Sequence, residues 1–413
     1  MKIYNLIINL LFLSYSLIEV ICEEDKYIEK TIYIEDGYPF IKLNISGQGE
    51  KKFYLSLLFP TIVAYPNNGS QDYRFNSAIN ETFNDINISL SVKDSRSNFS
   101  YDLEVGEAPI SLNNNDIVFN ISVLKNHNLD GQFAGIFGLN RGVDGNKFDT
   151  LIEQLFNKKL ISKKLFYIGP YYQEEELKKE SKLVIGKIPD SIKKYFDSFS
   201  NCSLVSNSYK CNISEFSFGK PNKKPNSNKR PFSKDIYINF VEGKIDKTIL
   251  PVSLIEYFLT NINRSKKKNN CNIDGNTINC PKNIENVSFL INKQEFKLSS
   301  IWENKTLYFN SNINNDTIIM GSELGNFHRI YDIGENRIYF LDKDSFDKAV
   351  SEEKENKIWV FIIIISTLLL LLCIIIIYRL MRKNKINKRN YSVSFQGDLY
   401  GDDEEDKEIN LAN

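Results

Sequence analysis

Residues 358–378 read Ile-Trp-Val-Phe-Ile-Ile-Ile-Ile-Ser-Thr-Leu-Leu-Leu-Leu-Leu-Cys-Ile-Ile-Ile-Ile-Tyr, and this stretch decides how the whole chain is organised. It contains no charged residue and matches the roughly 20 apolar residues that a helix needs to cross a bilayer. A buried core helix is the alternative, but so long an apolar stretch has no polar face to present to water. The sequence therefore predicts one transmembrane helix over residues 358–378.

The segment after this span is basic and then acidic. The positive-inside rule places such a basic flank, and with it the C-terminus, in the cytosol. The predicted cytoplasmic tail, residues 379–413, has low hydrophobicity, which favours a solvated, disordered segment. Contact of its basic half with anionic lipid head groups is the alternative. The basic residues are Arg379, Arg382, Lys383, Lys385, Lys388 and Arg389, and the acidic run is 402–406.

The N-terminus has the pattern of a secretory signal. Lys2 precedes an apolar run from Leu6 to Leu17, and Val20-Ile21-Cys22 allows cleavage before Glu23. A first membrane anchor is the alternative, but this run is shorter than a membrane span. We therefore predict a signal peptide over residues 1–22 and a single-pass type I membrane protein. Its ectodomain is extracellular or lumenal, and the lipid bilayer is its first predicted partner.

The ectodomain is long enough for two lobes of roughly 100 to 200 residues each. Most of its text is typical of strands: short, β-branched or aromatic runs separated by Asn, Gly and Asp turns. Apolar residues at helical spacing predict helices over 149–160 and 252–262. The strand-like runs are 30–34, 53–59, 86–92, 117–124, 182–186, 235–241, 287–291, 306–309, 317–320 and 337–341.

Two polar segments punctuate the ectodomain. Residues 219–231 are polar and proline-containing, which predicts a solvated inter-lobe loop over 216–234 rather than a heparin-type site. Residues 344–357 are charged and are predicted to form a loose stem. The formal net charge is zero, with 52 Lys and Arg against 52 Asp and Glu, so nothing in the composition indicates nucleic acid as a partner.

The cysteines fit an oxidising compartment. With Cys22 in the signal and Cys373 in the span, four remain at two equal spacings, which predicts two local disulfides. Each would stabilise the fold by about 2 to 4 kcal/mol. Zinc is disfavoured because the spacing is not that of a metal knuckle and no histidine is near. The predicted bridges are Cys202 to Cys211 and Cys271 to Cys280.

Acceptor sequences for N-glycans are frequent before the span, as expected for an ectodomain in the secretory lumen. A further match, at Asn390, falls in the cytosolic tail, and in so Asn-rich a chain several matches arise by chance. The candidates are Asn44, Asn68, Asn80, Asn87, Asn98, Asn120, Asn201, Asn212, Asn263, Asn286, Asn304 and Asn315.

Several segments, taken in chain order, point to a known family. In the first half they are Phe133-Ala134-Gly135-Ile136-Phe137-Gly138-Leu139, Phe148 to Leu155, Leu160 to Ser162, Leu165 to Tyr167 and Lys182 to Gly186. In the second half they are Ile249 to Pro251, Cys280, Val287 to Phe289, Phe296 to Leu298, Ile319 to Ser322, Ile330 to Asp332 and Asn336 to Phe340. In order and spacing these segments resemble the pepsin-like aspartic proteases over about residues 30–342.

The resemblance implies a mostly β, bilobal pepsin-like (acid protease) fold beside the C-terminal transmembrane helix. Its N-terminal lobe would cover residues 23–215 and its C-terminal lobe residues 235–343. The ectodomain is predicted to be monomeric. Members of the family cleave peptides with two aspartates that share a proton across the lobes, each in an Asp-Thr-Gly or Asp-Ser-Gly loop.

Neither of those loops is present at the matching positions. Leu57 lies where the first aspartate belongs, and a leucine can neither hold nor donate a proton. Glu242 lies at the second position without the Thr-Gly that should follow, and Asp246 is the other nearby acid. An ordinary surface carboxylate is the competing interpretation for both. The flap segment, Ser91 to Ser97, also lacks the family's tyrosine at its tip.

The preferred hypothesis is therefore a non-catalytic pepsin-like ectodomain that binds a peptide or protein at a surface. The alternative is an active membrane-bound aspartic endopeptidase that uses Glu242, and a structural coat protein without a specific ligand is a third. No metal site or cofactor is predicted. The segment 126–131 lacks a calcium loop's closing glutamate, and His127 and His328 have no nucleophile motif near them, so each is expected to be a surface or internally satisfied residue.

Overall fold

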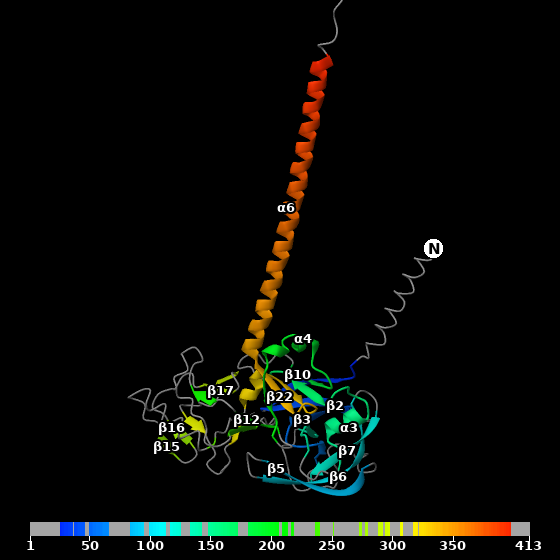
Figure 1. Ribbon diagram of the computed structural model, residues 1–413. Coiled ribbons are helices and arrows are strands. Elements are labelled where there is room, and N and C mark those ends of the chain that lie inside the picture. The colour runs from blue at the N-terminus through cyan, green and yellow to red at the C-terminus, as the bar shows by residue number, and fades with distance from the viewer. Residues whose placement is uncertain are drawn as a thin grey trace, which may run out of the picture. The chain divides into compact units, whose positions relative to one another are not determined.

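A computed structural model of the chain divides it into two compact units, Met1–Phe346 and Asp347–Asn413, which are described separately (Figure 1). The division of the first unit into two lobes, with the boundaries given above, stays a prediction. The structure describes residues 25–35, 37–45, 49–65, 83–94, 99–112, 116–124, 133–142, 148–171, 181–205, 209–213, 216–218, 236–239, 251, 272–274, 277–279, 288–291, 294–297, 306–308, 317–320 and 322–397.

The first unit is mostly β, as the sequence predicts. Its described strands are β1 Ile28–Glu35, β2 Tyr38–Ile45, β3 Gly49–Ser56, β4 Ile62–Ala64, β5 Asn84–Asp94, β6 Phe99–Ser111, β7 Asp116–Leu124, β8 Gly135–Gly138, β9 Leu165–Ile168, β10 Ser181–Ile185, β11 Ser200–Ser203, β12 Lys210–Ile213, β13 Phe216–Phe218, β14 Ile236–Asn239, β15 Asn272–Asp274, β16 Thr277–Asn279, β17 Ser288–Ile291, β18 Gln294–Lys297, β19 Thr306–Tyr308, β20 Thr317–Ile319, β21 Phe327–Asp332 and β22 Arg337–Asp342. Its short helical elements are α3 Leu151–Asn157, α4 Asp190–Lys193, η1 Phe196–Ser198 and η3 Ser322–Asn326.

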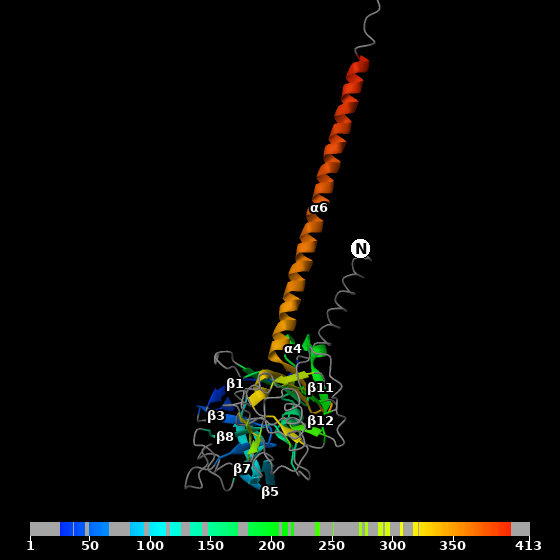
Figure 2. The same cartoon turned by 90° about the vertical axis from the view of Figure 1, so that its left-hand side faces the viewer.

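The largest sheet has thirteen strands in the order β11-β22-β21-β9-β10-β1-β2-β3-β8-β4-β7-β6-β5. Figure 2 shows β1, β3, β8, β7 and β5 following one another along it. The run from β11 to β1 is wholly antiparallel and brings together strands from distant parts of the chain. Its central pair, β9 and β21, aligns Phe166 with Tyr331.

Three pairs among the described strands are parallel, and one of them is β4 with β7 of the large sheet. In the first half, β3 lies parallel to β8, which also pairs with β4. In the second half, β14 lies parallel to β20, within the three-stranded sheet β12-β14-β20. The other described sheets are β13-β17-β18 and β15-β16-β19.

The main core lies on one face of the large sheet, and a second apolar cluster lies on the other. Successive side chains of a strand point to opposite faces, so one strand can supply both. On β3, Phe53 and Leu55 join the main core, whereas Tyr54 joins the second cluster. On β8, Phe137 and Ile136 divide in the same way. Every one of these five side chains is buried.

Helix α3 confirms the helix predicted over 149–160, although it is shorter. Thr150 caps its start in a reciprocal capping box, accepting from the Glu153 N–H while the Glu153 carboxylate accepts from the Thr150 N–H. The helix ends at Asn157 because Lys159 takes a left-handed conformation, with φ of 57°. The predicted helix over 252–262 lies outside the described residues.

Two other predicted boundaries change. The strand predicted over 53–59 ends at Ser56, because the chain then turns across the end of β8. Phe216–Phe218, predicted as the start of the polar loop 216–234, forms β13 and pairs with β17. The aromatic alternation of that tripeptide suits a strand, and the polar text begins only after it.

The second unit consists of most of helix α6, Lys343–Gly397, which contains the predicted span. Residues 343–383 make a helix long and apolar enough to cross a membrane, and the side chains of the span are exposed. Ser366 and Thr367 donate their hydroxyl hydrogens to the carbonyls of Ile363 and Ile364, so their polar groups are satisfied within the helix. The chain is therefore compatible with a single-pass membrane protein.

The predictions of a loose stem over 344–357 and of a disordered start to the tail are wrong, since both segments are helical. No glycine or proline lies between Lys343 and Gly397 to interrupt the helix. Pairs of opposite charge at helical spacing, Lys348 with Glu352 and Glu353 with Lys357, support the stem. The high charge content predicted a loose segment, but the charged residues are spaced to form ion pairs along a helix.

Candidate functional site at the crossing loop

The crossing loop, residues 57–61, joins β3 to β4. Because β3 and β4 lie on the two sides of β8, the loop must pass over the end of β8 at Gly138. A Cβ atom at this glycine would overlap the carbonyl oxygens of Phe59 and Thr61. Glycine is therefore required here by the close approach of two backbones.

The polar groups of the crossing loop are used within the fold. The Asn140 side chain donates to the Leu58 carbonyl at 2.8 Å, and the Asn140 backbone N–H donates to the Phe59 carbonyl at 2.8 Å. The Leu58 N–H donates to the Ser56 hydroxyl at 3.1 Å. The Leu151 N–H, at the start of α3, donates to the Pro60 carbonyl at 2.8 Å. Sequence reasoning missed Asn140, since a side chain that caps a distant carbonyl has no local signature.

The loop ends on a buried hydroxyl pair. The Thr61 and Ser122 hydroxyls lie 2.7 Å apart, and both residues are fully buried. Since Ser122 lies on β7, this hydrogen bond ties the end of the loop to the next strand of the sheet. Two hydroxyls can satisfy each other there without admitting a charge.

Leu57, the residue at the first expected catalytic position, is only 3% exposed and belongs to the main apolar core. It cannot exchange a proton, and its surroundings would oppose ionisation of an acid placed there. In the part of the chain that the structure describes, no aspartate or glutamate is buried. Glu242 and Asp246 lie outside the described residues, so the pairing of Glu242 with the position of Leu57 stays a prediction.

The β5–β6 hairpin reaches the crossing loop. Residues 99–102 of β6 pair with β5 alone, beyond the end of β7. From this projecting part, the Tyr101 ring meets the Phe59 ring edge-on with centroids 5.4 Å apart. Leu58, Leu90 and Tyr101 are partly buried against the second cluster. Part of each of these three side chains stays exposed beside the same cluster, and we call the three together the loop surface.

The flap predicted over 91–97 falls partly on this hairpin. Ser91 to Asp94 lie on β5, and residues 95–97 lie outside the described part. Sequence reasoning looked for a tyrosine at the tip and missed Tyr101, which lies on the returning strand. The alternation of Tyr101, Leu103 and Val105 was the available signal.

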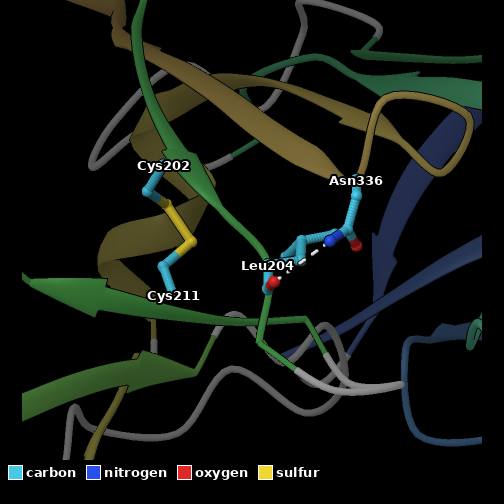
Figure 3. The surroundings of a disulfide bond; sticks show 4 residues. All are labelled: Cys202, Leu204, Cys211 and Asn336. Carbon is cyan, nitrogen blue, oxygen red and sulfur yellow. Dashed lines mark hydrogen bonds between the residues drawn. A yellow bond between two sulfur atoms is a disulfide. The ribbon is translucent and has the colours of Figure 1, made fainter.

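The predicted bridge between Cys202 and Cys211 is confirmed (Figure 3). It links β11, in the large sheet, to β12, in the three-stranded sheet, with Cα atoms 5.7 Å apart. Beside it, the Asn336 side chain donates to the Leu204 carbonyl at 3.2 Å. Cys271 and Cys280 lie outside the described residues, so their bridge stays a prediction.

A second polar site lies on the central strands of the large sheet. His328, 7% exposed, has its Nδ1 2.7 Å from the Tyr167 hydroxyl. Its ring stacks on the Tyr167 ring and contacts the Phe346 ring at 4.2 Å between centroids. Burial, together with the nearby charges of Arg329 and Lys343 and against that of Asp342, lowers the pKa of His328 to about 4.

This second site is structural. Burial also raises the pKa of Tyr167 far above its ordinary value, although Arg329 opposes the shift. Both partners are therefore neutral at physiological pH and satisfy each other, as expected for His328. His127 lies outside the described residues. Within the described ranges, no cluster of three His, Cys, Asp or Glu side chains could hold a metal ion.

Comparison with known proteins assigns no family to this chain. A scan against protein-family models finds no matching family, and a search of curated proteins finds no match.

Proposed function

We propose that the first unit is a catalytically inactive, pepsin-like ectodomain that is held at a membrane by α6 and binds a peptide or protein. In this proposal the bilobal arrangement and the type I orientation are those that the sequence predicts. The ligand lies against the loop surface, Leu58, Leu90 and Tyr101.

The strand topology supports two related halves. A parallel pair occurs in each, β3 with β8 and β14 with β20. In the sequence, glycine follows at the matching place, Gly138 at the end of β8 and Gly321 soon after β20. The antiparallel run from β11 to β1 then joins strands of both halves in one sheet. Such a repeat is what a bilobal pepsin-like fold requires.

The burial of Leu57 carries the proposal. Aspartic-protease chemistry needs two carboxyl groups that share one proton, and a single acid cannot form that pair. At the first of the two positions the chain has an apolar side chain packed into the core. Around it, the loop carbonyls accept hydrogen bonds from Asn140 and Leu151 rather than facing a reactant.

Without catalysis, the loop surface would bind a peptide or protein. Partly buried apolar side chains beside a fixed backbone suit the side chains of a peptide, and a preformed surface reduces the entropy cost of association. Membrane attachment through α6 would hold this surface at the membrane, where a ligand on a neighbouring surface could reach it.

The loss of catalysis is tested with the full-length chain in detergent micelles. An unfolded protein is incubated with it at acid pH, with and without a statine-type inhibitor, beside Glu242→Gln as the matched variant. We expect no inhibitor-sensitive cleavage from either chain. Cleavage that the inhibitor blocks and that Glu242→Gln abolishes would establish the active endopeptidase instead.

Binding is tested by selecting a phage-displayed random peptide library on the full-length chain in nanodiscs. We expect enriched peptides that bind saturably and lose at least tenfold in affinity with Leu58→Asp, a change of about 1.4 kcal/mol. Val118→Asp is the matched control, since Val118 is exposed on β7 and lies outside the loop surface. Failure to enrich any saturable peptide, or equal loss with both variants, would refute binding at this surface and favour a coat role.

A further inference from the structure

Within the described residues, β5 forms one end of the large sheet. Among the described strands β5 pairs with β6 alone. An edge strand presents backbone N–H and C=O groups that another chain can pair with, so soluble proteins protect such edges. At β5 the exposed residues are Asn84, Asp85, Asn87, Ser89 and Ser91.

A bulge distorts this edge at Ile86 and Asn87, and the Asn87 side chain is exposed. The register steps from the pair Asp85–Gly106 to the pair Ile88–Val105, so Ile86 and Asn87 have no residue opposite them on β6. Asn87 has φ of 57°, in the left-handed region that asparagine tolerates better than most residues. Its N–H donates to the Asp85 carboxylate at 2.8 Å, which holds the bulge.

Asn87 begins the acceptor sequence Asn87-Ile88-Ser89, and both polar residues of that sequence are exposed. Asn120 differs, because it is half-buried on the interior strand β7 and its backbone N–H and C=O are both bound by Gln154. The other candidate asparagines that the structure shows to be exposed, Asn201 and Asn212, also lie on strands at sheet ends, β11 and β12. Asn44 lies on the interior strand β2, and the remaining candidates lie outside the described residues.

We propose that Asn87 carries an N-glycan that screens the β5 edge against pairing with a second copy of this chain. The proposal requires only the lumenal orientation of the first unit and is independent of any bound ligand. The donor is a lipid-pyrophosphate-linked oligosaccharide. Its anomeric carbon bonds to the Asn87 Nδ2, the bond from that carbon to the pyrophosphate oxygen breaks, the lipid pyrophosphate leaves, and Nδ2 loses one proton.

The geometry explains why the glycan would act at this point. The bulge already breaks the regular spacing of the edge, and a bulky polar group on Asn87 would occupy the place of an approaching strand. Without the glycan, β5 of two copies could pair antiparallel across a twofold axis. That self-pairing is the association that the glycan prevents.

The test compares Ser89→Ala with Ser89→Thr in the full-length chain, expressed in secretory cells. Ser89→Ala removes the acceptor sequence without touching Asn87 or its bond to Asp85, whereas Ser89→Thr keeps the sequence and is the matched control. Peptide mapping reads glycan occupancy, and light scattering in detergent reads the mass of the protein particle. We expect Asn87 to be occupied in the native chain and in Ser89→Thr. Ser89→Ala should lose this glycan and show an approximately doubled protein mass.

Two results would overturn the proposal. An unmodified Asn87 in the native chain would refute the presence of a glycan there. A Ser89→Ala chain that has lost the glycan and is still monomeric would refute the screening role. Neither result affects the test of peptide binding, because Leu58 and Tyr101 lie outside the acceptor sequence.

Discussion

Acidification should destabilise the first unit through His328. The imidazole has an ordinary pKa of 6.5, and burial together with nearby charges lowers it to about 4 in the folded protein. The folded state therefore favours the neutral ring. The contribution of His328 to the free energy of unfolding is fully present above pH 6.5 and is lost as the pH falls from 6.5 toward 4. Each unit of difference corresponds to 1.36 kcal/mol, which gives a loss of about 3 kcal/mol across this window.

The matched variant is His328→Phe, which keeps an aromatic ring against Tyr167 and Phe346 but cannot gain a proton. It should start less stable by about 1 to 3 kcal/mol, because the buried Tyr167 hydroxyl loses its partner. Its stability should then change less between pH 6.5 and pH 4 than that of the native chain. Asp332 titrates at the acid end with the opposite sign, since its pKa is raised by burial, and it is present in both chains.

Denaturant unfolding of both full-length chains, followed by near-ultraviolet circular dichroism at several pH values, measures the difference. Hydrogen exchange of β21 and β22 gives a local reading at the same pH values, because β21 carries His328 and β22 pairs with it. Equal pH dependence in the native chain and in His328→Phe would refute the assignment of the acid sensitivity to this ring.

Three further changes probe the crossing loop and the disulfide. Gly138→Ala should destabilise the fold by about 3 kcal/mol or more, because the added methyl group overlaps two carbonyl oxygens. Gly334→Ala is the control, since its methyl group meets only a carboxylate oxygen at 3.3 Å. Equal proteolytic sensitivity of the two variants would contradict this prediction. Replacing Cys202 and Cys211 together by serine should lower the free energy of unfolding by about 3 kcal/mol, and an unchanged melting temperature would show that the bridge adds nothing. Leu57→Asp should lower the free energy of unfolding by several kcal/mol, because it buries an unpaired acid, and should give no acid-protease activity. Leu57→Met should lower it by less than about 1.5 kcal/mol. A stable Leu57→Asp chain that cleaves protein would contradict the proposed function.

The elements of the fold were predictable where the signal is local. Alternating β-branched residues predicted β7, and Thr150 with Glu153 marks the start of α3 by a capping box. The long strand β6 escaped prediction because Gly106 and Pro109 interrupt its pattern. The pairing order of the large sheet was beyond reach, since strands far apart in the chain become neighbours only through packing.

The candidate site divides in the same way. Leu57 was found because spacing along one strand and loop is a local property. The roles of Asn140, Tyr101 and His328 depend on contacts with residues tens to hundreds of positions away, for example His328 with Tyr167 across 161 residues. Such contacts leave no pattern in the text of one sequence.

The central pair of strands in the large sheet also determines when the protein can finish folding. β9 must wait for β21, because the two strands pair although they lie far apart in the chain. Contacts of such long sequence separation form slowly, and until then β9 exposes an unpaired edge. Since β22 ends at Asp342, just before α6 begins, the sheet closes only once nearly all of the first unit has been synthesised. An early stop in synthesis would therefore leave β9 with an aggregation-prone edge.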